Sequence, residues 1–284
     1  MAVVVVTDSS SRLGGELRER WGIRQIPLHV LDGDSDLRDG VDDVPSDIHD
    51  RPRVTTSGAT PTEIADVYRR ALADSGGDGV VAVHISAALS STYSSAASAA
   101  REFGHAVRVV NSRSAAMGVG FAALAAARAA HSGATLDEVE AAARSAAQRS
   151  HAFIVVHRLD NLRRSGRIGT AASWLGTALA LKPLLRLDID GRLVLSQRIR
   201  TASKAHAALV EQVLEEAGDR PVGVVVHHVD NPDAAEEIGE RLTERLPALR
   251  SLEISGMGPV LAVHVGGGAV GVVVSVEAEN QPSS

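Results

Sequence analysis

Short apolar runs alternate with helical stretches through the first half of this chain, and this alternation constrains the fold more than any other feature. Four β-branched runs, at residues 3–6, 26–31, 80–85 and 107–110, are bounded by polar residues or glycine, as strands usually are. Strands that alternate with helices form mostly parallel sheets whose faces are covered by the helices. We therefore expect an α/β fold with a mostly parallel N-terminal sheet.

Two helices of this half carry start signals. The run Thr60-Pro61-Thr62-Glu63 offers a capping hydroxyl, a proline at the first helical position and a glutamate at the third. It predicts a helix that extends to about Asp74. Thr135 and Glu138 have the same Thr-x-x-Glu spacing and predict a second helix to about Ser150.

The second half has a different pattern and predicts an α+β domain with mixed or antiparallel strands. Asp190-Gly191 is a strong hairpin signal between two of its apolar runs. We place the domain boundary near Ser150, so that residues 1–150 form the α/β domain and residues 151–284 the α+β domain. Residues 32–53 and the tail after Glu277 predict loops. The predicted strands are 154–156, 184–188, 192–197, 222–229, 259–265 and 270–276, and the predicted helices are 170–181, 201–217 and 233–245.

Composition excludes several functional classes. The 284 residues include no cysteine, which excludes disulfides, thiolate catalysis and cysteine-ligated metals. A net charge of -6 and an aromatic content of 2% oppose binding to nucleic acid. Neither Lys182 nor Lys204 follows a glycine, so a Walker A phosphate loop is absent. The first apolar run is too short for a signal peptide, and we expect a cytoplasmic protein with no membrane span.

The sequence predicts no cofactor and no metal. Residues 266–271 match G-x-G-x-x-G, but the following run predicts a strand, whereas a dinucleotide fingerprint opens a helix. His227 and His228 are adjacent, and alternating strand positions would point their rings to opposite faces. Structural or surface histidines are the better interpretation of this pair.

Four polar clusters lie beside predicted strands. Residues 7–11, 86–93 and 111–114 follow strands directly, and residues 55–61 precede the capped helix. Ligands of parallel sheets bind beyond the carboxyl ends of the strands. Hydroxyls and free helix N-terminal amides gathered there suit an anionic group such as a carboxylate. Each hydroxyl could instead only cap a helix, and the two roles are compatible.

These residues also resemble motifs of the DegV family of bacterial fatty-acid-binding proteins. Thr56-Ser57-Gly58-Ala59-Thr60-Pro61 resembles its Thr-Ser-Gln-Pro-Ser-Pro motif, and Leu89-Ser90-Ser91-Thr92-Tyr93 resembles Leu-Ser-Gly-Thr-Tyr. Residues 159–168, which include Arg167, resemble Leu-x-x-Leu-x-x-Gly-Gly-Arg-Ile. Residues 262–268, which include His264, resemble Ala-His-Thr-Gly-Pro-Gly. The motifs occur in the family's order from about residue 3 to residue 276, with Arg200 between the last two.

The resemblance implies two α/β domains with a long-chain fatty acid enclosed between them. It implies no catalysis by the chain alone, because a separate kinase subunit would transfer phosphate from ATP to the bound carboxylate and form an acyl phosphate. The glycine before Arg167 predicts an exposed loop for this arginine. The implied ligand-binding residues are Thr56, Ser57, Ser90, Ser91 and His264, and the implied partner or phosphate contacts are Arg167 and Arg200.

The chain departs from the family motifs at Gly58-Ala59, at Ser91 and at Val265, which removes a threonine hydroxyl beside the histidine. Two other functions stay open. The chain could be a lipid sensor without a kinase. It could also be a hydrolase in which Ser90 or Ser91 is the nucleophile, His264 the base and Asp8 its orienter, although no Gly-x-Ser-x-Gly elbow occurs. A solvated basic face and a core histidine are the simpler roles for the arginines and for His264.

Overall fold

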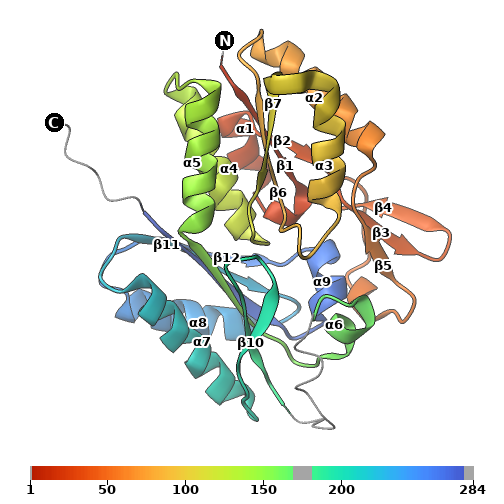
Figure 1. Cartoon of the computed structure of the whole chain (residues 1–284). Coiled ribbons are helices and arrows are strands. Elements are labelled where there is room, and N and C mark those ends of the chain that lie inside the picture. Colours follow the sequence, from red (N-terminus) through yellow and green to blue (C-terminus); the bar gives the residue numbers. More distant parts are fainter. Residues whose placement is uncertain (1, 169–180, 278–284) are drawn as a thin grey trace.

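The protein consists of two halves that pack against each other (Figure 1). The computed structural model describes residues 2–168 and 181–277. The N-terminal half ends with helix α5, and the C-terminal half begins with strand β8 at Ser150. Except for Leu181, the helix expected over residues 170–181 lies outside the described residues, as does the tail after Glu277.

A four-stranded parallel sheet organises the N-terminal half, as the sequence predicts. Its order is β2-β1-β6-β7, and each neighbouring pair is parallel. The residues that follow β1, β6 and β7 therefore gather along one edge of the sheet, where parallel sheets bind ligands. The strands are β1 (Val4–Asp8), β2 (Arg24–Ile26), β6 (Val80–His84) and β7 (Val107–Asn111).

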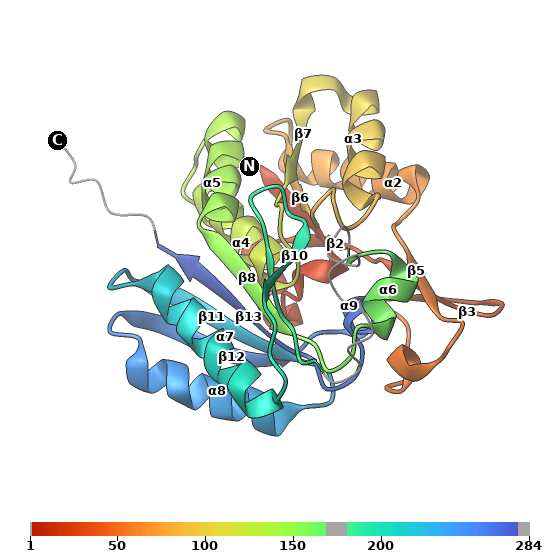
Figure 2. The ribbon, with the colours of Figure 1, turned by 60° about the horizontal axis from the view of Figure 1, so that its bottom comes forward.

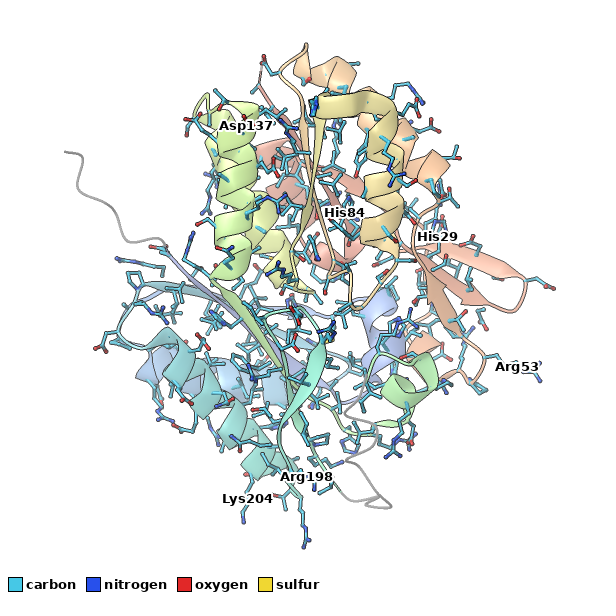
Figure 3. All side chains as sticks on the ribbon, in the orientation of Figure 1. His29, Arg53, His84, Asp137, Arg198 and Lys204 are labelled. Carbon is cyan, nitrogen blue, oxygen red and sulfur yellow. The ribbon has the colours of Figure 1, made fainter. Side chains whose placement is uncertain are left out.

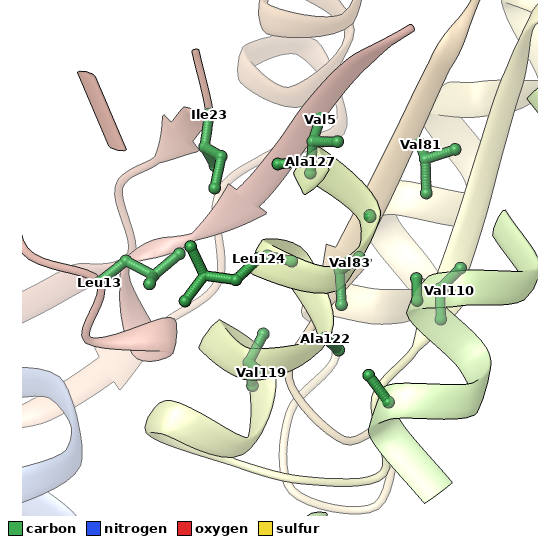
Figure 4. Packing of buried hydrophobic residues seen from close by; sticks show 14 of the residues in the cluster. Val5, Leu13, Ile23, Val81, Val83, Val110, Val119, Ala122, Leu124 and Ala127 are labelled. Atoms are coloured by element: carbon green, nitrogen blue, oxygen red, sulfur yellow. The ribbon is translucent and has the colours of Figure 1, made fainter. Parts of the chain in front are cut away.

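Helices cover both faces of this sheet. Helices α2 and α3 pack on one face, and α4 and α5 pack on the other, where α1 contacts α4. Small side chains of α4, such as Ala122 and Ala127, pack against valines of β1 and β6 (Figure 4). Capping boxes at Thr60 and Thr135 confirm the two predicted helix starts. The helices are α1 (Gly15–Trp21), α2 (Pro61–Ser75), α3 (Thr92–Ala100), α4 (Met117–His131) and α5 (Leu136–Gln148), with 3-10 helices η1 (Ser9–Ser11), η2 (Ile48–Asp50) and η3 (Arg101–Ala106).

A small antiparallel sheet of order β4-β3-β5 contradicts two of the predictions. The run at residues 26–31 is two strands in different sheets, because Pro27 has no N–H to continue a ladder. Residues 32–53 are not all loop, since they contain β4 and η2. The strands are β3 (His29–Asp32), β4 (Ser35–Arg38) and β5 (Thr55–Ser57).

A six-stranded mixed sheet organises the C-terminal half, again as predicted. Its order is β10-β9-β8-β13-β11-β12, in which β11 and β12 are parallel and the other neighbours antiparallel. Strands β9 and β10 form the hairpin predicted at Asp190-Gly191. The strands are β8 (Ser150–Val155), β9 (Leu184–Leu187), β10 (Leu193–Gln197), β11 (Val222–His228), β12 (Leu249–Gly256) and β13 (Val270–Val276).

The two faces of the mixed sheet have different neighbours. Helices α7 (Ala202–Ala217) and α8 (Pro232–Arg245) cover one face. The other face sends Val225 and Val273 into the core cluster of the N-terminal half. The two halves therefore share apolar packing along this face. The short helix α6 (Asp160–Ser165) packs against the helical segment at residues 259–265.

The strand predicted at residues 259–265 is wrong, because this segment is the helix α9 (Pro259–Val265). Pro259 occupies the first helical position, and Gly258 before it has φ 76°, a left-handed conformation that turns the chain out of β12. Val260 and Val263 pack together against the small sheet, which is the three-residue spacing of a helix. A short β-branched run does not by itself distinguish a strand from a buried helix.

The β9–β10 hairpin reaches from the C-terminal half to the N-terminal half (Figure 2). At its tip, Ser86 Oγ donates a hydrogen bond to the carbonyl oxygen of Gly191 at 2.8 Å. Gly191 has φ 75°, and a Cβ there would meet backbone atoms of Arg113 at 2.8 Å. Glycine is therefore required at this contact, by conformation and by space.

Candidate functional site

A cavity of about 340 Å³ lies between the two halves. Its wall is largely apolar and comes from the parallel sheet's carboxyl edge, the inner face of the mixed sheet, the β9–β10 hairpin and α9. A cavity of this size and character is typical of a small-molecule site. Apolar wall residues include Ala115, Ala116, Phe153, Leu187, Leu193 and Val273.

Thr56 and His264 meet at the cavity wall although 208 positions separate them. Thr56 lies on β5 in the N-terminal half, and His264 lies on α9 in the C-terminal half. A hydrogen bond of 2.7 Å joins Thr56 Oγ1 and His264 Nε2. The predicted pair is thus assembled from both halves, and a ligand beside it would contact both.

Ser90 joins this group through Gly58 and Thr92. The hydroxyls of Ser90 and Thr92 are hydrogen-bonded at 2.9 Å, and Ser90 Oγ also accepts from the amide of Thr92 at 3.2 Å. A Cβ on Gly58 would lie 2.7 Å from Thr92 Oγ1, so the absent side chain lets the β5–α2 connection approach α3 closely. The departure from the family motif at Gly58 therefore has a local packing reason.

Ser57 and Ser91 also line the cavity, and both are exposed at its mouth. The structure thus brings together all five predicted ligand-binding residues. Arg200 is exposed and does not belong to the cavity wall.

Arg167 is half-buried in the cavity wall, so the prediction that it lies on an exposed loop is wrong. Gly166 does form the expected turn, with φ 73°, but the guanidinium folds back. Its Nε donates to the carbonyl oxygen of Leu89 at 3.2 Å, and its Nη1 donates to that of Ser165. Among the described residues that line the cavity, Arg167 alone carries a fixed charge.

His264 is uncharged at neutral pH. Burial lowers its pKa to about 4, and the positive charge of Arg167 adds to this effect. Its Nδ1 is buried and has no hydrogen-bond partner among the residues that the structure describes. A buried polar atom without a partner costs free energy, which a polar ligand would recover.

Asp8 is committed to a network deeper in the N-terminal half and does not orient His264. Its Oδ2 accepts from the amide of Ile85 at 3.0 Å and bonds with His84 Nδ1 at 3.0 Å. His84 Nε2 bonds in turn with the hydroxyl of Tyr68 at 3.0 Å. Asp8, His84 and Tyr68 are fully buried, and His84 lies inside the N-terminal half (Figure 3). This network fixes the ends of β1 and β6 and does not form the Ser-His-Asp arrangement of a hydrolase.

The cavity also contains a histidine that the sequence did not assign to it. His227 is buried, its Nδ1 bonds with Ser255 Oγ at 3.0 Å, and its Nε2 accepts from the amide of Met117 at 3.3 Å. Burial lowers its pKa to about 3. His228 is only half-buried, so the two rings differ in environment as alternation predicts. His227 lies on β11, in a different sheet from the polar clusters, so no sequence signal linked it to the cavity.

The described part of the chain offers no group of three or more histidine or acidic side chains that could hold a metal ion. Within the same residues, no helix has both the length and the apolarity to cross a membrane.

The chain is similar to known proteins over nearly its whole length. A family model described as "Uncharacterised protein, DegV family" matches residues 2–277. A DegV domain-containing protein of Mycobacterium tuberculosis is 62% identical over 278 residues, which cover 98% of this chain and 99% of that protein. A DegV family protein from Thermus thermophilus, described with fatty acid binding, is 32% identical, with a TM-score of 0.91 and coverage of 98% of this chain and 100% of that chain. DegV from Bacillus subtilis, described as a fatty acid binding protein, is 28% identical, with a TM-score of 0.86 and the same coverage.

Proposed function

Because this chain belongs to the DegV family, we propose that it binds one long-chain fatty acid between its two halves. The observation that carries the proposal is that polar side chains from both halves meet at one end of an apolar cavity. The polar end suits a carboxylate, and the apolar remainder suits an acyl chain. Each buried CH₂ contributes about 0.8 kcal/mol, so a long chain would stay bound through purification.

The carboxylate would lie beside Thr56, Ser90, His264 and Arg167. The hydroxyls supply donors, and the guanidinium supplies the charge that a buried anion needs. His264 stays neutral, and because the Thr56 hydroxyl has a single proton, Thr56 donates to the carboxylate when His264 Nε2 carries the ring proton and donates to Thr56 Oγ1. Ser57 and Ser91 at the mouth complete the set of donors.

Fatty-acid binding is tested by native mass spectrometry of the purified protein, followed by denaturing extraction of the lipid. We expect one acyl acid per chain, and we expect added fatty acid to raise the melting temperature of lipid-free protein. The proposal is wrong if no acyl acid is extracted and added fatty acids neither bind nor stabilise the protein.

We further propose that the chain presents the carboxylate to a separate kinase subunit, which forms the acyl phosphate. The absence of a Walker A loop from the sequence agrees with a partner that supplies ATP. Arg200, which is exposed and outside the cavity, would contact that partner or its phosphates.

Reconstitution with kinases of the same organism tests this second step. Arg200→Ala should slow acyl phosphate formation and leave fatty-acid affinity unchanged. If lipid binds but no kinase uses the protein, the kinase-independent sensor is the function that fits. Hydrolysis of nitrophenyl esters is the corresponding test for a hydrolase, which the pairing of Asp8 with His84 does not favour.

A further inference from the structure

A second cavity, of about 440 Å³, opens where the two halves meet on another side of the hairpin. Its wall comes from the end of α5, the residues after β7, the start of β8, strand β9 and the end of α7. It shares only Ala152 and Leu187 with the first cavity, among the described residues that line either one. In contrast to the first cavity, its wall is rich in charged and polar side chains.

Three arginines from separate elements line this second cavity. Arg113 follows β7, Arg144 lies on α5, and Arg186 lies on β9. Arg144 is paired with Glu140 at 2.6 Å. Among the described residues, neither Arg113 nor Arg186 has a carboxylate partner within ion-pair distance. Two positive charges are therefore available in a protein whose net charge is -6.

The acidic residues of the wall are already engaged. Asp188 Oδ1 accepts from the backbone amides of Asp190 and Arg192, at 3.0 and 2.8 Å, and so shapes the hairpin turn. Glu216 contacts His151 Nε2 at 3.2 Å. Burial lowers the pKa of His151, against the opposing effect of Glu216, so this ring adds little charge at neutral pH. These contacts do not remove the carboxylate charges, so the wall carries three guanidinium groups against two carboxylates and its balance is positive.

Arg113 is also held in an uncommon backbone conformation, with φ 52°. A non-glycine residue in this region costs free energy and persists only where its surroundings enforce it. Here the surroundings are the hairpin tip, because the backbone of Arg113 packs directly on Gly191. The strained turn thus places Arg113 of the N-terminal half in the same cavity wall as Arg186 of the C-terminal half, and Arg113 Nη1 donates to the carbonyl oxygen of Ile189 at 3.5 Å.

We propose that this second cavity binds a small phosphate-bearing anion, which bridges Arg113 of one half and Arg186 of the other. Guanidinium groups match phosphate oxygens in geometry and charge. The volume of about 440 Å³ lies within the range of small-molecule sites, which is roughly 300–1,000 Å³. Side-chain donors such as Ser112 and Tyr93 also belong to the wall.

Occupancy of this site would hold the β9–β10 hairpin closed over the first cavity. Leu187 and Leu193 of the hairpin line the first cavity, while Asp188 and Ile189 at its tip line the second. An anion that joins Arg186 to Arg113 adds to the bond between Ser86 and Gly191 at the same tip. It should therefore slow the exchange of bound fatty acid, a consequence that rests on the proposed function.

Calorimetric titration of the full chain with inorganic phosphate, pyrophosphate and ATP, without divalent cations, tests the site. We expect saturable binding of at least one of the three, weakened about tenfold or more in Arg113→Gln and Arg186→Gln. Arg192→Gln is the matched control, because Arg192 lies on the same hairpin, pairs with Asp190 at 2.6 Å and lines neither cavity. The proposal is overturned if none of the anions binds saturably, or if all three variants bind like the wild type.

The release rate of a fluorescent fatty acid, measured with and without the bound anion, tests the coupling. We expect slower release with the anion in the wild type and in Arg192→Gln, and no effect in Arg186→Gln. Anion binding without any change in release would overturn the coupling alone. A protein that binds the anion but no fatty acid would contradict the proposed function and leave the anion site standing.

Discussion

Replacing Thr56 by valine should weaken fatty-acid binding and also destabilise the fold. Valine keeps nearly the shape of threonine and removes only the hydroxyl. That hydroxyl is 2.7 Å from His264 Nε2 and lines the cavity. A lost hydrogen bond to a charged carboxylate costs about 1.5–3 kcal/mol, which raises the dissociation constant about 10- to 150-fold.

The effect on stability arises because the Thr56 hydroxyl is also the hydrogen-bond partner of His264 Nε2. His264 Nδ1 already has no partner among the described residues, so Thr56→Val leaves both ring nitrogens unpaired. An unsatisfied buried group costs about 1–3 kcal/mol, so the midpoint of urea unfolding should fall for the lipid-free protein.

Displacement of a fluorescent fatty acid measures the affinity, and urea unfolding measures the stability. Thr55→Val is the matched control, because Thr55 is the neighbouring residue on β5, is exposed and does not line the cavity. Wild-type affinity in a folded Thr56→Val protein would refute the assignment of the hydroxyl to the carboxylate site. Equal losses in both variants would attribute the effect to the strand rather than to the site.

Three further predictions concern the surroundings of this site. Arg167→Gln should weaken fatty-acid affinity about tenfold and raise the pKa of His264, because the guanidinium charge lowers that pKa. If an NMR titration of the His264 ring shows an unchanged pKa, the Arg167 charge does not act on His264. Gly258→Ala should lower the free energy of unfolding by more than about 1 kcal/mol, because Gly258 has φ 76° and the new Cβ would overlap the Arg12 guanidinium. Gly256→Ala is the control in the same urea experiment and should change the free energy of unfolding little, because a Cβ there has open space. Acidification from pH 6.5 to about 4 should destabilise the lipid-free protein, because the pKa of His264 is about 4 in the folded state and about 6.5 in the unfolded state, which therefore takes up the proton first. The contribution of His264 to this loss should approach about 1.4 kcal/mol per pH unit, and His264→Gln should remove that contribution from the slope of stability against pH.

Local signals account for the parts of the fold that the sequence predicts correctly. The capping boxes at Thr60 and Thr135 need only four consecutive residues, and Asp190-Gly191 needs only two. The parallel sheet follows from runs that are apolar along their whole length, because such strands are buried on both faces. Each of these features depends on a few consecutive residues and little on distant parts of the chain.

The wrong predictions concern segments whose structure depends on distant neighbours. Residues 259–265 are as β-branched as a strand, but Val260 and Val263 find their partners on the small sheet and therefore take helical spacing. The strand β4 in the segment predicted as loop has only exposed and half-exposed residues, and its pairing with β3 provides the order that periodicity lacks.

The sequence also predicts one part of the candidate site and misses another. The residue types at Thr56, Ser90 and His264 were found from motifs, and the structure brings all three to one cavity. The sequence could not predict that the Arg167 side chain folds back into the cavity wall. The carbonyl oxygens of Leu89 and Ser165 fix its direction, and every residue type has a backbone carbonyl.

The position of β13 has a consequence for the order in which the protein can fold during synthesis. It is the most C-terminal strand that the structure describes, yet it lies between β8 and β11 at the centre of the mixed sheet. Until residues 270–276 leave the ribosome, β8–β10 and β11–β12 have no strand to connect them, and Val273 is missing from the core of the N-terminal half. A nascent chain that already holds Thr56, Ser90 and His264 therefore has no closed cavity. Because Gly271, Val272 and Val273 line the first cavity, its wall is complete only after β13 has been added to the sheet.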